Sequence, residues 1–232
     1  MPSPSRPVPT GHTGSQRPYV LLSCAMSVDG YIDDSSPDRL VLSSAEDLDR
    51  VDEVRSGCDA ILIGANTIRR DNPRLLVNSS DRRARRVAHG QPAYPTKVTI
   101  TASGLDPALK FFQTGGDKLV YCPSGATEQV RAALGEVAQV VPAGDPLDLA
   151  RVLADLHARG VGRLMVEGGS SLHTQFLTGG LADELHLVVA PIFVGDPTAP
   201  RLVNPGSFPP GRLAVDEIRQ VGDVVLIRYR LS

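Results

Sequence analysis

Short apolar runs alternate with stretches of helical spacing along most of the chain, and this alternation restricts the possible folds more than any other feature. The runs at residues 20–25 and 60–64 are each long enough for one buried strand, and residues 44–57 and 147–159 have the spacing of helices. Strands separated by helices predict an α/β fold with a mostly parallel sheet covered by helices on both faces. The last two runs, 212–220 and 224–231, meet at Gly222-Asp223 and predict an antiparallel hairpin.

The same patterns place the remaining elements. Further strands are expected at residues 98–101, 119–122, 139–141, 163–166 and 184–190, and helices at 127–134 and 170–177. In the first helix, which Ser44 can cap, Leu48, Val51 and Val54 are expected to share the buried face. Residues 78–95 are expected to form one long irregular loop.

Composition narrows the class of protein. The chain has 232 residues and a net charge of −2, so whole-chain electrostatics give no case for nucleic acid, and no apolar run approaches the roughly 20 residues of a membrane helix. Cys24, Cys58 and Cys122 lie in or beside apolar runs, which indicates reduced thiols in a cytoplasmic protein. Neither Cys-x-x-Cys nor His-x-x-x-His occurs, so we expect no metal site. Residues 1–18 have the composition of a disordered leader, and 19–232 are expected to form a single domain.

The segment Val166-Glu167-Gly168-Gly169 ends one predicted strand and leads into a helix. Backbone N–H groups at such a turn can bind a phosphate, and the carboxylate would then lie beside the bound group. A tight turn that binds nothing is the alternative for this segment alone. Glycine-containing or small polar segments also follow three other predicted strands, at residues 27–30, 64–75 and 101–104. Because ligands bind at the carboxyl ends of parallel strands, these four segments predict a ligand site at one sheet edge.

These segments resemble the reductase family of riboflavin biosynthesis, whose fold is similar to that of dihydrofolate reductase. The resemblance rests on several motifs in the same order, namely Ser27-Val28-Asp29-Gly30, residues 55–61, residues 64–75, Val166-Glu167-Gly168-Gly169, and residues 181–184 leading to 190–195. The His-x-Glu and Cys-x-x-Cys ligands of the zinc deaminase that some members carry do not occur here. The chain therefore resembles the stand-alone reductase.

The resemblance implies NADPH-dependent reduction of a ribosylaminopyrimidine 5′-phosphate, with hydride delivered to ribose C1′ to give a ribitylamino product. It implies that the cofactor contacts Ala25, Thr67, Asp71, Ser103, Gly168, Gly169, Ser170, Ser171 and Leu172. It implies substrate contacts for Ser27, Asp29, Arg55, Leu75, Asn78 and Glu167, with Glu167 and Asp71 as catalytic residues. From its charge, Glu167 could stabilise a developing iminium. The family also implies a homodimer, for which we expect the apolar C-terminal strands to supply the interface.

Several of these residues have simpler alternatives. Arg55 near a helix end could serve the helix dipole, Asp29-Gly30 and Asp71-Asn72-Pro73 could only shape turns, and His173 is expected to be structural or solvent-facing. Asn78 stands where the bacterial bifunctional pattern places an arginine for the substrate phosphate, and Ala102 replaces a serine, with Ser103 adjacent. We expect Arg55 and an arginine from residues 74–86 to bind that phosphate.

Three functions therefore remain open at the level of sequence. The first is the riboflavin-pathway reductase. The second is a reductase of the same fold acting on another pyrimidine, a pterin or a related heterocycle. The third is an NADPH-binding protein that has lost catalysis, against which the intact Thr67, Asp71 and Glu167 argue.

Overall fold

The computed structural model describes residues 16–36 and 40–231, and within that part of the chain nine strands form one sheet in the order β5-β4-β3-β2-β6-β1-β7-β9-β8. Strands β1 to β7 pair in parallel, and β9 runs antiparallel to both β7 and β8. The predicted α/β class, the mostly parallel sheet and the C-terminal hairpin are confirmed. The strands are β1 (Tyr19–Ser27), β2 (Ala60–Gly64), β3 (Thr96–Ile100), β4 (Lys118–Cys122), β5 (Gln139–Pro142), β6 (Arg163–Glu167), β7 (Glu184–Ala190), β8 (Ala214–Val221) and β9 (Val224–Arg230).

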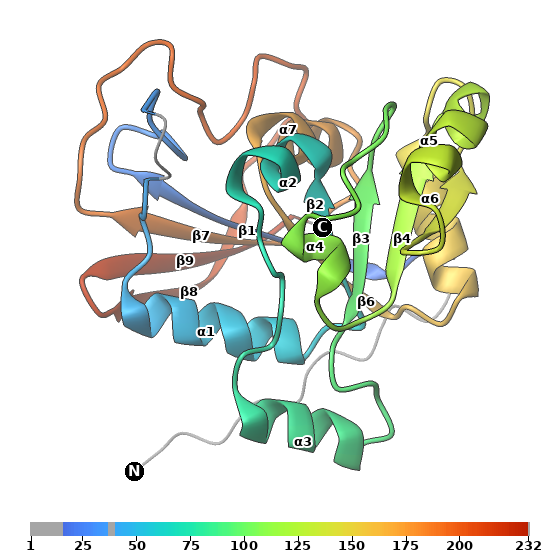
Figure 1. Cartoon of the computed structure of the whole chain (residues 1–232). Coiled ribbons are helices and arrows are strands. Elements are labelled where there is room, and N and C mark those ends of the chain that lie inside the picture. The colour runs from blue at the N-terminus through green and yellow to red at the C-terminus, as the bar shows by residue number, and fades with distance from the viewer. Residues whose placement is uncertain (1–15, 37–39, 232) are drawn as a thin grey trace.

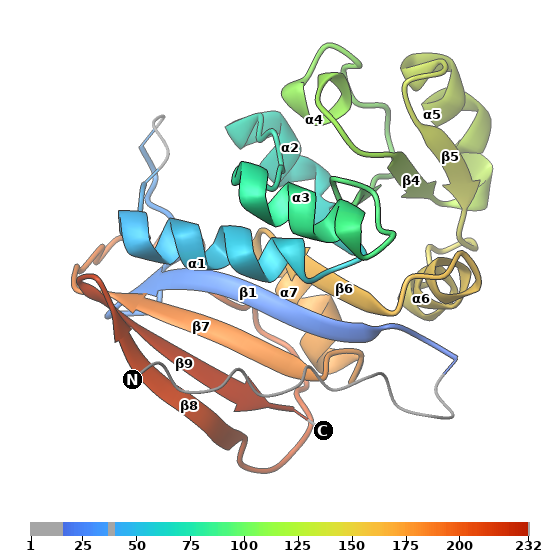
Figure 2. The same cartoon turned by 90° about the horizontal axis from the view of Figure 1, so that it is seen from below.

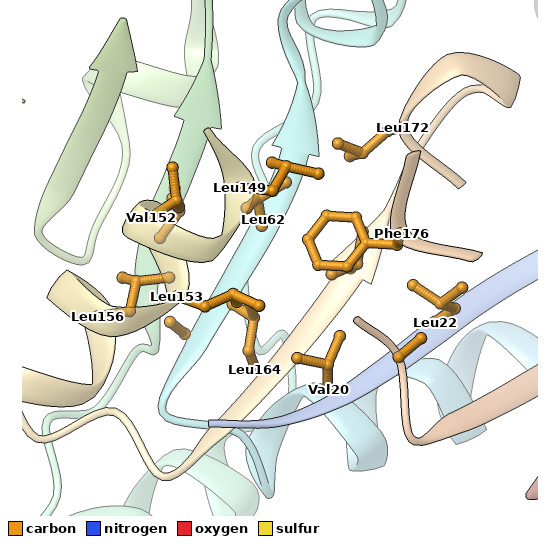
Figure 3. Close-up of a cluster of buried hydrophobic side chains, with 14 of the residues drawn as sticks. Val20, Leu22, Leu62, Leu149, Val152, Leu153, Leu156, Leu164, Leu172 and Phe176 are labelled. Atoms are coloured by element: carbon orange, nitrogen blue, oxygen red, sulfur yellow. The ribbon is translucent and has the colours of Figure 1, made fainter. Parts of the chain in front are cut away.

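Helices cover both faces of the sheet, as predicted (Figure 1). They are α1 (Ala45–Ser56), α2 (Ala65–Asp71), α3 (Ser80–Ala88), α4 (Lys110–Gln113), α5 (Thr127–Leu134), α6 (Leu149–Ala158) and α7 (Ser170–Thr178), with a 3₁₀ turn, η1, at Ser124–Ala126. Helices α6 and α7 pack on one face, where Leu156 and Phe176 contribute to a core with Leu22 and Leu62 (Figure 3). Helices α1, α2, α4 and α5 cover the opposite face, packing around Leu21 and Ile61.

Helix α1 begins where the sequence predicts, because the Ser44 side chain accepts a hydrogen bond from the Asp47 backbone N–H. Its buried face differs from the prediction. Val51 and Val54 pack against the sheet, but Leu48 is half exposed, and the inward positions include Asp47 and Asp52, which are buried. The hydrophobic pattern is therefore confirmed for Val51 and Val54 and wrong for Leu48, because α1 also buries polar side chains.

The expectation of one irregular loop over residues 78–95 is wrong, because this segment contains α3. The Ser79 side chain caps it by accepting from the Arg82 N–H, and Arg82 pairs with Asp49 and Asp52 of α1. Figure 2 shows α3 lying beside α1. Helix α3 is rich in arginine and is held by ion pairs, so hydrophobic periodicity misses it. The short helices α2 and α4 are further elements that this periodicity does not predict.

Residues 1–15 of the predicted leader lie outside the described residues. Its last part is anchored to the domain, since the Arg17 guanidinium donates to both carboxylate oxygens of Asp183 at 2.7 Å. Between β7 and β8, residues 191–213 run as a long connection that arches over one side of the molecule (Figure 1). Within the described ranges, no helix is long and apolar enough to cross a membrane.

Candidate active site

A cleft of about 1090 Å³ opens at the carboxyl ends of β1, β2, β3 and β6, and α1 and residues 197–205 complete its walls. The structure brings most of the predicted site residues together here. The residues that line the cleft include Ala25, Arg55, Thr67, Asp71, Leu75, Ser103, Glu167, Gly168, Gly169, Ser170, Ser171 and Leu172. The predicted segments that follow β2, β3 and β6 thus converge at one sheet edge beside the end of β1, whereas residues 27–30 do not line the cleft.

Arg55 and Glu167 form a two-pronged ion pair inside this cleft. Arg55 Nε donates to Glu167 Oε1 and Arg55 Nη2 to Glu167 Oε2, each at 2.7 Å, and Nη1 donates to the Leu76 carbonyl at 3.2 Å. Burial alone would lower the pKa of the guanidinium, but the charge and hydrogen bonds of Glu167 outweigh it and raise that pKa. The arginine therefore stays cationic, and the carboxylate is held in one orientation with its charge balanced.

The glycine turn after Glu167 leaves room for close backbone approach. Gly168 has a φ of +126°, and a Cβ there would lie 3.3 Å from both the Gly64 nitrogen and Thr67 Oγ1. Gly169 is the N-cap of α7, and within the part of the chain that the structure describes no side chain caps that helix. The Leu172 N–H donates to the Gly169 carbonyl at 3.1 Å, and the N–H groups at the start of α7 can serve an anionic group in the cleft.

Positive charge lines the same cleft. Besides Arg55, the lining includes Arg50, Arg69, Arg70 and Arg201. Arg69 Nη2 donates to Ser103 Oγ at 2.9 Å and to the Gly104 carbonyl at 3.3 Å, so it is fixed beside the loop that follows β3. A multiply charged cofactor fits the combination of an open helix N-terminus, a glycine turn and these arginines.

Three predicted substrate residues do not line the cleft. Ser27 is fully buried, and its hydroxyl donates to Asp29 Oδ1 at 2.6 Å. Asp29 in turn accepts from the N–H groups of Val194 and Gly195 at 3.1 and 2.8 Å, which ties two loops together. Asn78 is exposed, and its N–H is bonded to Asp52.

The arginines of residues 74–86 are also absent from the residues that line the cleft. Arg82 pairs with acidic residues of α1, and Arg85 pairs with Glu53. Arg83 donates to the carbonyls of Val77 and Asn78, while Arg86 is buried and donates to backbone carbonyls. These side chains hold α3 and its flanking segments in place.

Two titratable groups near the cleft are unsuited to proton transfer. Burial raises the pKa of the Cys24 thiol to about 12, and the charge of Glu167 adds to that shift, so the thiol stays protonated. His173 is fully buried, which excludes the solvent-facing alternative, and its burial lowers the pKa to about 4. His173 does not line the cleft. The three cysteines are free, and no cluster within the described ranges could hold a metal ion.

Asp47 and Arg50 of α1 line the cleft, although no sequence motif marks them. Arg50 Nε donates to Asp47 Oδ1 at 2.7 Å, and Arg50 Nη1 lies 3.5 Å from His186 Nδ1. The sequence does carry a signal for them, because positions 47, 50, 51 and 55 follow the i, i+3, i+4, i+8 spacing of one helix face. A search of the sequence for the apolar face of α1 does not identify Asp47 and Arg50, because both are polar.

Comparison with known proteins identifies relatives over nearly the whole chain. The model of the RibD C-terminal domain family matches residues 18–227. The chain is 33% identical over 218 residues to the 2,5-diamino-6-ribosylamino-4(3H)-pyrimidinone 5′-phosphate reductase of Archaeoglobus fulgidus, covering 93% of this chain and 99% of that protein. It is 38% identical over 190 residues to the protein of the same name from Methanothermobacter thermautotrophicus, covering 81% and 84%.

Solved structures show the same fold. A pyrimidine reductase-like protein from Corynebacterium diphtheriae has a TM-score of 0.77 at 23% identity, with 92% of this chain and 91% of that chain covered. A diaminohydroxyphosphoribosylaminopyrimidine deaminase/5-amino-6-(5-phosphoribosylamino)uracil reductase from Thermotoga maritima has a TM-score of 0.76 at 21% identity, with 93% and 57% covered.

Proposed function

The chain belongs to the RibD C-terminal domain family, and on this basis we propose that it reduces a ribosylaminopyrimidine 5′-phosphate with NADPH, delivering hydride to ribose C1′. The main support for this proposal is the Arg55–Glu167 ion pair, which lies in the same cleft as the turn at Gly168 and the N-terminus of α7, where no side-chain cap is observed among the described residues. One cleft thereby offers a fixed carboxylate next to a place for a pyrophosphate.

NADPH would supply the hydride. We assign its pyrophosphate to the turn from Gly168 to Leu172, with further contacts from Ala25, Thr67 and Asp71. Support comes from the position of all these residues on the cleft wall and from the uncapped first turn of α7. The Arg69–Ser103 pair is our candidate for the 2′-phosphate that distinguishes NADPH from NADH, because a guanidinium and a hydroxyl are suitable phosphate donors.

The substrate would lie between this cofactor and α1. We propose that Glu167 faces the ribosylamine, where its negative charge favours the cationic iminium that forms as the sugar ring opens. The oxygens of Glu167 retain lone pairs beyond those used by Arg55. The walls formed by α1 and residues 197–205 would keep water from the imine, which water hydrolyses.

The test is NADPH oxidation by the purified protein with phosphorylated ribosylaminopyrimidines, followed by identification of the ribitylamino product. We expect turnover with the phosphorylated compound and much less with its dephosphorylated form. Equal turnover of both forms, or turnover only of a pterin or another heterocycle, would instead favour a reductase of a different pathway.

We also propose that the protein is a homodimer that pairs through the hairpin β8–β9. Ile218 pairs with Ile227 and Val215 with Tyr229 in the register of the two strands, so these side chains share one face. Ile218, Val215 and Val225 are exposed at 68%, 53% and 40%, which is unusual for a contiguous apolar face. A reducing cytoplasmic location is proposed as well, and the free thiols support it.

A further inference from the structure

We propose that Asp47 recognises the 2-amino group of the pyrimidine ring and makes the enzyme selective for the diamino substrate over its deaminated counterpart. The inference deepens the proposed function and rests on it. Asp47 lies in the first turn of α1, at the opposite end of the helix from Arg55, and acts as the specificity determinant of the cleft.

The Asp47 side chain is 1% exposed and yet belongs to the wall of the cleft. Its Oδ1 accepts from Arg50 Nε at 2.7 Å, but its Oδ2 has no hydrogen-bond partner among the described residues. A buried carboxylate oxygen without a donor is costly, so native proteins rarely keep one without a purpose. Because Asp47 borders the cleft, we assign the donor that this buried oxygen lacks to an N–H group of a ligand bound beside it.

The position of Asp47 suits the far end of the substrate. Arg55 contacts Glu167, and Asp47 lies eight positions before Arg55 on α1, which corresponds to about 12 Å along the helix axis. With the ribosylamine at Glu167, we place the ring attached to it along α1, toward Asp47, which lines the same cleft. Arg50 fixes the carboxylate from the side, so its orientation is set before a ligand arrives.

The two candidate rings differ at the atom that Asp47 would contact. The 2,5-diamino-4(3H)-pyrimidinone ring carries an amino group on C2 next to N3–H, so it presents two adjacent donors. The corresponding uracil carries a carbonyl oxygen on C2, which a carboxylate oxygen repels. The Asp47 carboxylate accepts a hydrogen bond from the 2-amino group and therefore disfavours the uracil. In the uracil the carboxylate oxygen would face the C2 carbonyl oxygen, and neither of these two acceptors can donate a hydrogen bond to the other.

The test compares kcat/KM for both 5′-phosphates, with NADPH, in the native protein and in the variant Asp47→Asn. We expect the native protein to prefer the diamino compound by about 10-fold or more, the scale of a hydrogen bond to a charged group. Asparagine is nearly isosteric with aspartate and its amide can donate to the uracil carbonyl, so in this variant the preference should disappear or reverse. NADPH affinity should stay unchanged, and Asp47→Ser serves as a second variant if the first does not fold.

The control is Asp49→Asn, because Asp49 lies on the same helix but is 70% exposed and pairs with Arg82 away from the cleft. It should keep the native preference. A native protein that uses both compounds equally, or an Asp47→Asn variant that retains the diamino preference, overturns the inference and leaves the proposed function intact.

If the protein reduces neither 5′-phosphate, a binding experiment still distinguishes the proposed reaction from the proposed role of Asp47. Calorimetry measures binding of the free ring, 2,5,6-triamino-4(3H)-pyrimidinone. Binding to the native protein that is lost in Asp47→Asn supports the role of Asp47 even though the proposed reaction fails. Equal binding to both proteins, or none to the native protein, overturns it.

Discussion

Both carboxylate oxygens of Glu167 are bonded to Arg55, which joins the end of β6 to the last turn of α1. The Arg55 side chain is 18% exposed and the Glu167 side chain is 16% exposed, so the ion pair is accessible from the cleft. The sequence predicts that Arg55 binds the substrate phosphate. The structure gives it a prior partner, and its effect on the substrate is therefore expected to pass largely through Glu167.

Glu167→Gln keeps the shape of the side chain and removes its charge. If Glu167 stabilises a developing cation, kcat should fall by about 100-fold, while NADPH affinity stays close to native. Steady-state kinetics and a separate NADPH titration measure the two quantities. A variant with native kcat would show that the carboxylate has no part in the chemical step.

Arg55→Ala is expected to lower kcat as well as raise KM, because it frees the Glu167 side chain and leaves its charge unbalanced. Arg55→Lys is the matched control, since lysine keeps the charge but cannot form the two parallel hydrogen bonds of a guanidinium. It should recover only part of the loss. A rise in KM alone for Arg55→Ala would restore the simpler assignment of Arg55 to the substrate phosphate.

Gly169→Val tests the pyrophosphate assignment. A Cβ at Gly169 would lie 3.7 Å from Thr67 Oγ1, an ordinary contact, so the fold should tolerate the larger side chain. Blocked backbone approach should raise the NADPH dissociation constant at least ~10-fold, or about 1.4 kcal/mol. Gly162→Val, at the opposite end of β6, is the control and should bind NADPH normally. Normal binding by a folded Gly169→Val protein argues for a different cofactor position.

Lys97 gives the stability a pH dependence that can be measured. It is fully buried on β3, and its Nζ donates to the carbonyls of Arg74 and Phe111 and to the Thr114 hydroxyl. Burial lowers its pKa from 10.5 to about 7. Between these values the unfolded chain binds more protons at this group than the folded protein, so Lys97 makes stability rise with pH.

Urea denaturation between pH 7 and 8.5 tests this prediction. The upper limit is the ordinary pKa of thiols, about 8.5, so that the ionisation of cysteines adds little to the measured pH dependence. Lys97→Met should flatten the rise in the unfolding free energy, whereas Lys110→Met, at an exposed position of α4, should not. An identical slope in Lys97→Met and the native protein would show that Lys97 stays charged in the fold. Because Lys97 holds the carbonyl next to Leu75, its loss should also weaken the cleft wall formed by Leu75.

The strands could be predicted because buried parallel strands are short apolar runs, and residues 60–64 or 184–190 leave few alternatives. Helix α3 could not be predicted, since it is held by ion pairs such as Arg82–Asp49 that depend on the placement of α1.

The residues that line the cleft could be predicted where a sequence motif marks them, as at Gly168. Asp47 and Arg50 could not, because their role follows from burial beside a cleft, and sequence spacing shows only that they share a face with Arg55. At Asp29 the motif suggests a ligand contact, which stays a prediction, while in the structure its oxygens accept from the Ser27 hydroxyl and from backbone N–H groups.

The proposed dimer can be tested at Ile218, the most exposed of the apolar side chains on the hairpin. Ile218→Asp places a charge at the centre of the proposed interface, where its desolvation would oppose association. Since the side chain is 68% exposed in the single chain, the fold of each subunit should survive. Sedimentation should therefore show a dimer for the native protein and a folded monomer for the variant at micromolar concentration.

Val87→Asp is the matched control, because it changes a 57% exposed valine of α3, and this variant should remain dimeric. A native monomer, or a dimer unaffected by Ile218→Asp, would remove the hairpin face from consideration as the interface.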